Sequence, residues 1–173
     1  MKYKSMVLVF VVSMVLTLFM FFLYTPNILM AKLEFDAQTN GTHGQLVLHP
    51  QAQAGEDKIV RMSPDLLYSS CQFDLDKGAY QITSPIYDDY LSLSIFASNS
   101  DNIFAVNDLQ SPNGFNVVLA KKGSEINVPD GATLVETNSS FGLILFRYYL
   151  GKKIVSELDK QREQANCTLL TSS

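Results

Sequence analysis

An uncharged, apolar run near the start of the chain limits its fold more than any other feature. Met6–Tyr24 contains 19 consecutive residues without a charged side chain. A helix of that length is roughly 28 Å long, close to the thickness of the hydrocarbon core of a bilayer. Soluble domains rarely contain a helix that is apolar on every face over such a length. We therefore predict an N-terminal transmembrane helix, with residues 1–24 as a membrane anchor.

A cleaved secretory signal peptide is the alternative interpretation of this run. The apolar region of a signal peptide usually has 7–15 residues and ends at a small-x-small cleavage site. Here the run is longer and continues into Thr25–Met30, which has no Ala-x-Ala pattern. Tyr24 also suits the interface between lipid and water. The sequence favours an uncleaved anchor and leaves the signal peptide as the alternative.

Two lysines indicate the orientation of the anchor. Lys2 and Lys4 precede the apolar run on a very short flank, and positively charged flanks stay in the cytoplasm. We therefore predict a single-pass protein of the inner (cytoplasmic) membrane with a periplasmic C-terminal domain. The predicted partners are the lipid bilayer, through residues 6–24, and an unidentified envelope protein or small molecule.

Composition excludes several classes of function. The 173-residue chain has a net charge of −4, which argues against a nucleic-acid-binding protein of the ordinary basic kind. Its two cysteines are too few for a disulfide framework or a four-ligand zinc module.

Residues 25–62 are predicted to connect the anchor to a folded domain. Asn27–Ala37 is compatible with a short helix, and Pro26 suits the first turn of such a helix. Asn40–Gly44 is predicted to be a loop, and the polar segment Gln51–Asp57 has no periodic apolar pattern.

From Ser63 to about residue 170 the sequence predicts a β domain followed by a helix. Short apolar runs alternate with turn residues at a spacing typical of an antiparallel β-sandwich. The predicted strands are Asp65–Leu75, Tyr80–Thr83, Tyr90–Ala97, Asn102–Asn107, Phe115–Ala120, Glu125–Val128, Thr133–Thr137 and Phe141–Tyr149. Tyr90–Ala97 alternates like a half-buried strand, and Phe141–Tyr149 is apolar on both faces, as a central strand is. Lys152–Ala165 is predicted to be a single C-terminal helix.

A search for catalytic motifs predicts no catalytic, cofactor-binding or metal-binding residue. The chain has no Gly-x-Ser-x-Gly elbow, phosphate-binding glycine loop or His-Glu-x-x-His motif. Its two histidines, His43 and His49, would need Asp36 or Glu56 to complete a metal site, and solvated loop histidines are the favoured interpretation. Asp74–Gly78 resembles the opening of a calcium loop, but the glycine comes one position early. A turn at the end of a strand is favoured there.

Arg147 interrupts the most apolar predicted strand, and a buried arginine needs a partner. We expect a carboxylate partner, with Asp74 or Asp108 as the best candidates because both end strands. The alternative is that Arg147 anchors an anion or carboxylate in a pocket. The residues predicted to be buried and polar, or to line a pocket, are Tyr68, Asp74, Tyr90, Asn107, Asp108 and Arg147.

Cys71 and Cys167 are predicted to form a disulfide. They are the only cysteines, and both lie in the segment predicted to be outside the cytoplasm, where disulfides persist. The bridge would tie the first core strand to the tail that follows the C-terminal helix. Two unpaired thiols are the alternative.

Several segments together resemble a known family. They are Pro64–Leu75, Lys77-Gly78 followed by Pro85, Asp89–Phe96, Asn99–Asp108, Phe141–Arg147 and Cys167. They resemble short, N-terminally anchored members of the bacterial domain-of-unknown-function family 1254, over most of residues 27–170. The resemblance implies a jelly-roll-like β-sandwich. Larger relatives carry a second β domain, which we expect this chain to lack, and the family supplies no catalytic residues.

These observations favour a membrane-tethered extracytoplasmic module that binds or interacts, rather than an enzyme. An envelope enzyme, such as a hydrolase, and a structural subunit of a membrane complex are the alternatives. We expect no cofactor.

Overall fold

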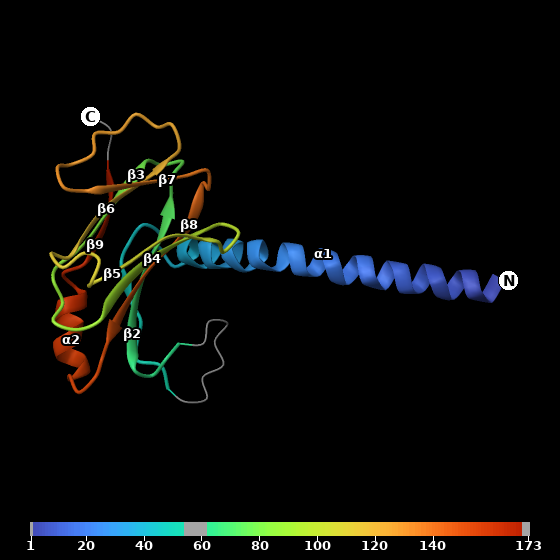
Figure 1. Cartoon of the computed structure of the whole chain (residues 1–173), viewed down its shortest axis with the longest axis horizontal. Helices are drawn as coiled ribbons and strands as arrows, with labels where there is room; N and C mark the ends of the chain where they lie inside the picture. Colours follow the sequence, from blue (N-terminus) through green and yellow to red (C-terminus); the bar gives the residue numbers. More distant parts are fainter. Residues whose placement is uncertain (1, 54–61, 171–173) are drawn as a thin grey trace.

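The computed structural model describes residues 2–53 and 62–170 and shows a β-sandwich from which one long helix projects (Figure 1). The fold class predicted from the sequence is confirmed: mainly β, with an N-terminal helix and one short C-terminal helix. In chain order the elements are α1 (Lys2–Thr39), β1 (Val47–Leu48), β2 (Leu66–Asp74), β3 (Ala79–Ser84), β4 (Leu91–Ala97), β5 (Asn102–Asn107), β6 (Phe115–Lys121), β7 (Thr133–Thr137), β8 (Phe141–Tyr149), α2 (Val155–Arg162) and β9 (Asn166–Leu170).

The larger sheet has five antiparallel strands in the order β1-β2-β8-β4-β5. β8 is central, as its apolar sequence predicts. Gly142 on β8 faces the core where a Cβ atom would overlap the Phe96 carbonyl and the Phe73 ring, so only glycine lets the three strands approach there. β4 differs from its prediction as a half-buried strand, because Ser92 and Ser94 on its outward face are also buried.

The smaller sheet has the order β7-β6-β3-β9 and is mixed rather than antiparallel, because β7 lies parallel to β6. A parallel pair needs a crossover connection instead of a hairpin. The predicted strand Glu125–Val128 is wrong: this segment forms part of the crossover and has no strand structure. Its apolar residues Ile126 and Val128 instead pack on the outer face of β6 and β3, which explains their strand-like pattern.

The core lies between the two sheets and is closed by a disulfide. Phe73, Ile95, Phe146 and other side chains of the larger sheet meet residues such as Ile82 and Leu119 of the smaller one. The predicted Cys71–Cys167 bond is confirmed, with the two Cα atoms 6.6 Å apart. Cys167 lies in strand β9 rather than in a tail, so the bond joins β2 of one sheet to β9 of the other.

The C-terminal helix is shorter than predicted. α2 ends at Arg162 and the chain then forms β9, which pairs with β3. α2 packs Leu158 into the sandwich core. The helix ends early because Asn166–Leu170 pairs with β3 at the edge of the smaller sheet. Helix propensity is a local property and does not predict this long-range pairing.

α1 runs without a break through Pro26, so the separate short helix predicted after this residue is instead the last part of α1. Thr25 donates from its hydroxyl to the Phe21 carbonyl at 2.6 Å. Long apolar helices tolerate proline when hydroxyl side chains bond carbonyls nearby. Met30 and Ala37 are buried against the sandwich, so the end of α1 is part of the folded domain.

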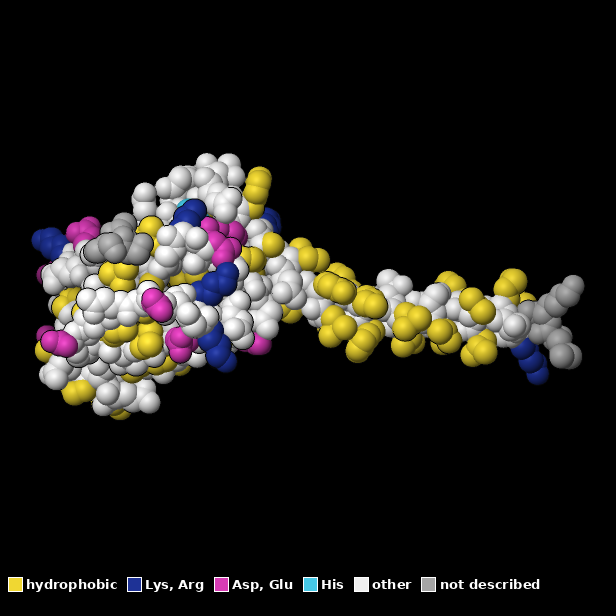
Figure 2. All heavy atoms as spheres, turned by 90° about the horizontal axis from the view of Figure 1, so that it is seen from above, with side chains coloured by type: hydrophobic (Ala, Val, Ile, Leu, Met, Phe, Trp, Pro, Cys, Tyr) yellow, Lys and Arg dark blue, Asp and Glu magenta, His cyan; other side chains and the backbone are white. Residues whose placement is uncertain are grey.

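Among the residues that the structure describes, α1 is the one helix long and apolar enough to cross a membrane. Apolar side chains cover it on all visible sides, while the domain surface carries mixed charges (Figure 2). None of its most apolar window is buried against the domain, as expected of a segment that meets lipid. This finding supports a single-pass membrane anchor.

Candidate functional site

The outer face of the five-stranded sheet carries a line of polar residues, which we call the polar row: Tyr68, Arg147, Ser92 and Asn107. Strand register creates it, because Tyr68 pairs with Arg147, Arg147 pairs with Ser92 and Ser92 pairs with Asn107. Directly opposed residues of antiparallel strands point to the same face of a sheet. The structure therefore brings together three of the residues predicted from the sequence, Tyr68, Arg147 and Asn107, and adds Ser92.

Arg147 is half-buried at the centre of the polar row, and its Nη1 donates to Ser94 Oγ at 2.9 Å. The expected carboxylate partner is wrong for the described residues, none of which places a carboxylate oxygen within 4.0 Å of this guanidinium. Asp74 lies at the far end of β2, opposite Phe141, and pairs with Lys77 at 3.3 Å. Asp108 accepts a hydrogen bond from the Leu91 amide at 3.3 Å.

Hydroxyl groups line both sides of Arg147. Ser92 is 6 % exposed, and its Oγ has no hydrogen-bond partner among the described residues. Ser70, also outward-facing, lies 2.7 Å from His49 Nε2. The Tyr68 hydroxyl accepts a hydrogen bond from the Ser63 amide at 2.9 Å. A guanidinium flanked by hydroxyls offers several donors in one place, which suits a carboxylate or a phosphate.

The remaining predicted residues lie apart from the polar row. Asp74, the last residue of β2, and Asp108, which directly follows β5, make the local contacts given above. Tyr90 precedes β4 and is exposed, and its carbonyl accepts a hydrogen bond from the Tyr149 amide at 2.9 Å.

Sequence reasoning missed the most buried arginine. Arg162 on α2 is 2 % exposed and donates twice to Asp159 Oδ1, at 2.5 and 3.1 Å. It also donates to the carbonyls of His49 at 3.0 Å and Tyr68 at 2.7 Å. Arg162 lies in a charged helical segment, a pattern typical of solvated side chains, so the sequence carries no clear signal of its burial. This arginine has a structural role, because it fastens α2 to β2 and the segment after β1.

A second polar group lies where α1 meets the domain, and we call it the joint cluster: Glu34, His43, Asp74 and Lys77. His43 Nε2 is 2.8 Å from Glu34 Oε1, while Lys77 Nζ is 3.4 Å from His43 Nδ1 and 3.3 Å from Asp74 Oδ2. From the sequence, we considered a metal site containing both His43 and His49. The structure separates the two side chains, because His49 contacts Ser70 and His43 contacts Glu34. Glu56 lies outside the described residues.

Tyr80 supports the joint cluster from the core side. Its hydroxyl accepts a hydrogen bond from the Asp74 amide at 3.4 Å. Burial raises the pKa of Tyr80 above its ordinary value. The phenol therefore stays neutral at physiological pH and adds no negative charge beside the carboxylates.

Family comparison agrees with the sequence resemblance. The profile of a family described as protein of unknown function (DUF1254) matches residues 44–168. The chain belongs to the DUF1254 family. The matched region contains β1 to β8, α2, the disulfide and the whole polar row. Comparison with curated proteins gives no match.

Two solved structures are similar to this chain. The VPA0106 protein from Vibrio parahaemolyticus matches with a TM-score of 0.65 and 14% sequence identity, over 85% of this chain and 35% of that chain. A putative uncharacterized protein from Burkholderia cenocepacia matches with a TM-score of 0.45 and 15% identity, over 65% of this chain and 33% of that chain. This chain thus spans about a third of the length of each. The first likeness supports the fold alone.

Proposed function

We propose that this DUF1254 protein is a membrane-tethered, periplasmic binding module that holds an anionic group against the polar row. The observation that carries the proposal is Arg147, half-buried with one protein hydrogen bond among the described residues, beside the buried and unpartnered hydroxyl of Ser92. Buried polar groups normally have hydrogen-bond partners. An anion at Arg147 would supply an acceptor to both groups.

The architecture around the polar row favours binding over catalysis. The polar row offers hydrogen-bond donors on a rigid, central part of the sheet, because Arg147 lies on β8 and Ser92 on β4. The four residues of the polar row include no histidine and no carboxylate, the groups that usually carry acid–base chemistry. The contact between His49 Nε2 and Ser70 Oγ, at 2.7 Å, lies outside the row, two positions along β2 from Tyr68. We infer that the anchor holds this face at the membrane, where it meets a soluble or envelope-bound ligand.

The test is binding of small anions to the full chain in detergent micelles. We expect acetate, citrate or inorganic phosphate to raise the melting temperature of the wild type in a saturable way. Arg147→Met is expected to weaken the affinity at least about tenfold, because a hydrogen bond to a charged group contributes about 1.5–3 kcal/mol. Isothermal titration calorimetry measures the dissociation constants.

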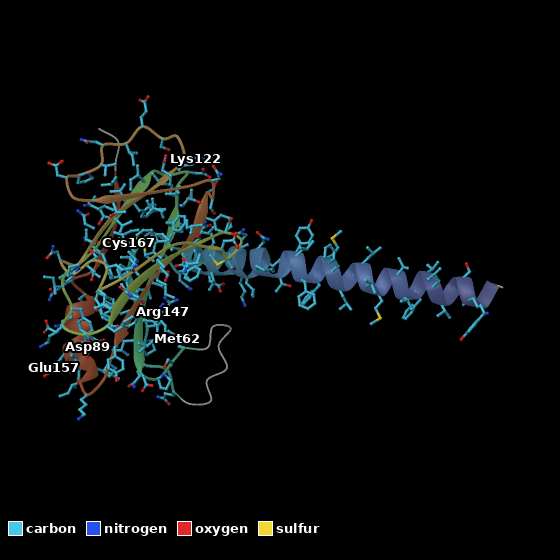
Figure 3. The ribbon with its side chains drawn as sticks, viewed as in Figure 1. Met62, Asp89, Lys122, Arg147, Glu157 and Cys167 are labelled. Carbon is cyan, nitrogen blue, oxygen red and sulfur yellow. A yellow bond between two sulfur atoms is a disulfide. The ribbon has the colours of Figure 1, made fainter. Side chains whose placement is uncertain are left out.

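Lys122→Met is the matched control, since it also removes one positive charge but lies far from Arg147, in the turn after β6 (Figure 3). It should leave the affinity unchanged. Equal binding by Arg147→Met and the wild type, or no saturable binding of any of the three anions, would contradict the proposal.

A further inference from the structure

Three side chains from separate elements converge at the joint cluster. Glu34 comes from α1, His43 from the loop after α1, and Asp74 from the end of β2. One nitrogen or oxygen atom of each lies within 4.8 Å of the other two. The side chains of Glu34, His43 and Asp74 are only 12%, 10% and 19% exposed. Chain folding, rather than sequence spacing, brings these groups together.

One oxygen of the Glu34 carboxylate lacks a hydrogen-bond partner among the described residues. Oε1 of this carboxylate accepts a hydrogen bond from Gln38 Nε2 at 2.9 Å and faces His43 Nε2. Its Oε2 is buried and has no hydrogen-bond partner among the described residues. Leaving a buried carboxylate oxygen without a donor or a cation costs free energy. This atom therefore points to a positively charged ligand that the protein side chains do not supply.

Lys77 supplies a positive charge to the other side of the joint cluster, beside Asp74 and His43. Its Nζ approaches both Asp74 and His43, but its side chain is 53% exposed. A side chain so exposed can move into solvent at little cost. The position of the Lys77 ammonium shows that the joint cluster attracts positive charge. A metal ion bound by the same groups would displace this ammonium.

We propose that Glu34, His43 and Asp74 form a binding site for a divalent transition metal of the Zn²⁺ class. One imidazole and two carboxylates are a ligand set that suits zinc or a similar ion, with a fourth position left for water. Calcium and magnesium prefer oxygen ligands alone. Because Glu34 belongs to α1 and Asp74 to β2, the ion fastens the end of the anchor helix to the sandwich. This site is independent of the polar row.

The test uses Zn²⁺ alone and the metal-free full chain in detergent micelles, with affinity measured by titration against a chromophoric chelator. We expect one Zn²⁺ to bind per chain and to raise the melting temperature. His43→Gln should weaken binding at least about tenfold, because it removes the only nitrogen ligand in the site. His49→Gln, which changes the other histidine, should leave the affinity unchanged.

Lys77→Met separates a metal site from an ordinary ion-pair network. If Zn²⁺ displaces the ammonium, removing this competitor should strengthen zinc binding. If the cluster is only an ion-pair network, Lys77→Met gives no gain in zinc affinity, and the proposal fails. Equal zinc binding by His43→Gln and the wild type would also overturn it. Lys77 lies on the surface, so this variant remains informative even where His43→Gln does not fold.

Discussion

Replacing both cysteines by alanine is expected to lower the free energy of unfolding by about 4–5 kcal/mol. Cys71 and Cys167 are 96 positions apart in the sequence, and a bond across so long a loop restricts the unfolded chain strongly. The bond also joins β2 to β9, and therefore one sheet of the sandwich to the other. Both cysteines are buried, so solvent reaches the bond only when the sandwich opens. Urea unfolding, followed by circular dichroism of the full chain in micelles, measures the effect.

The control for this prediction is the reductant. Dithiothreitol should shift the urea midpoint of the wild type toward that of the Cys71→Ala/Cys167→Ala variant and leave the variant unchanged. A loss below about 1 kcal/mol in the variant would show that the bond contributes little to stability. Two free thiols in the unreduced, denatured wild type would refute the bond itself.

Arg162→Met is expected to destabilise the fold by about 3 kcal/mol. Arg162 is almost fully buried, and its guanidinium makes four hydrogen bonds, two to Asp159 and two to main-chain carbonyls. Breaking a buried ion pair typically costs 3–5 kcal/mol. We expect the lower end of that range, because Asp159 is 37% exposed and regains water. The shift in the urea midpoint measures the loss.

Arg147→Met is the matched comparison for Arg162→Met, since both replace an arginine by methionine. Arg147 is only half-buried and makes one hydrogen bond among the described residues, to Ser94. We therefore expect a loss below about 1 kcal/mol, as for most substitutions outside the core. Equal losses in the two variants would mean that burial does not distinguish the two arginines.

The strands that sequence analysis predicted correctly are those whose local pattern agrees with their tertiary surroundings. β8 is apolar on both faces and is central, and β4 turns Leu91, Leu93 and Ile95 toward the core as its alternation predicts. Errors arose where a distant partner decides the structure. Asn166–Leu170 becomes a strand only because β3 offers an open edge, and Glu125–Val128 loses strand structure because it crosses over β6.

The candidate sites depend on register and chain folding, which one sequence does not reveal. Tyr68, Arg147 and Asn107 could be selected as polar residues in β-like segments, but their alignment across four strands required the pairing of β2, β8, β4 and β5. The alternation of Ser92 and Ser94 with apolar residues was the available signal for the missed hydroxyls. Glu34, His43 and Asp74 come from three separate segments, and no motif spacing connects them.

We propose that the disulfide-bonded domain lies outside the cytoplasm on a single-pass anchor. The most direct test fuses a topology reporter after Ser173, using alkaline phosphatase, which is active only outside the cytoplasm, or a fluorescent protein that matures only inside it. We predict an active phosphatase in the membrane fraction and no fluorescence, because the positive charges of Lys2 and Lys4 favour a cytoplasmic N-terminus. Fluorescence together with an inactive phosphatase would contradict it.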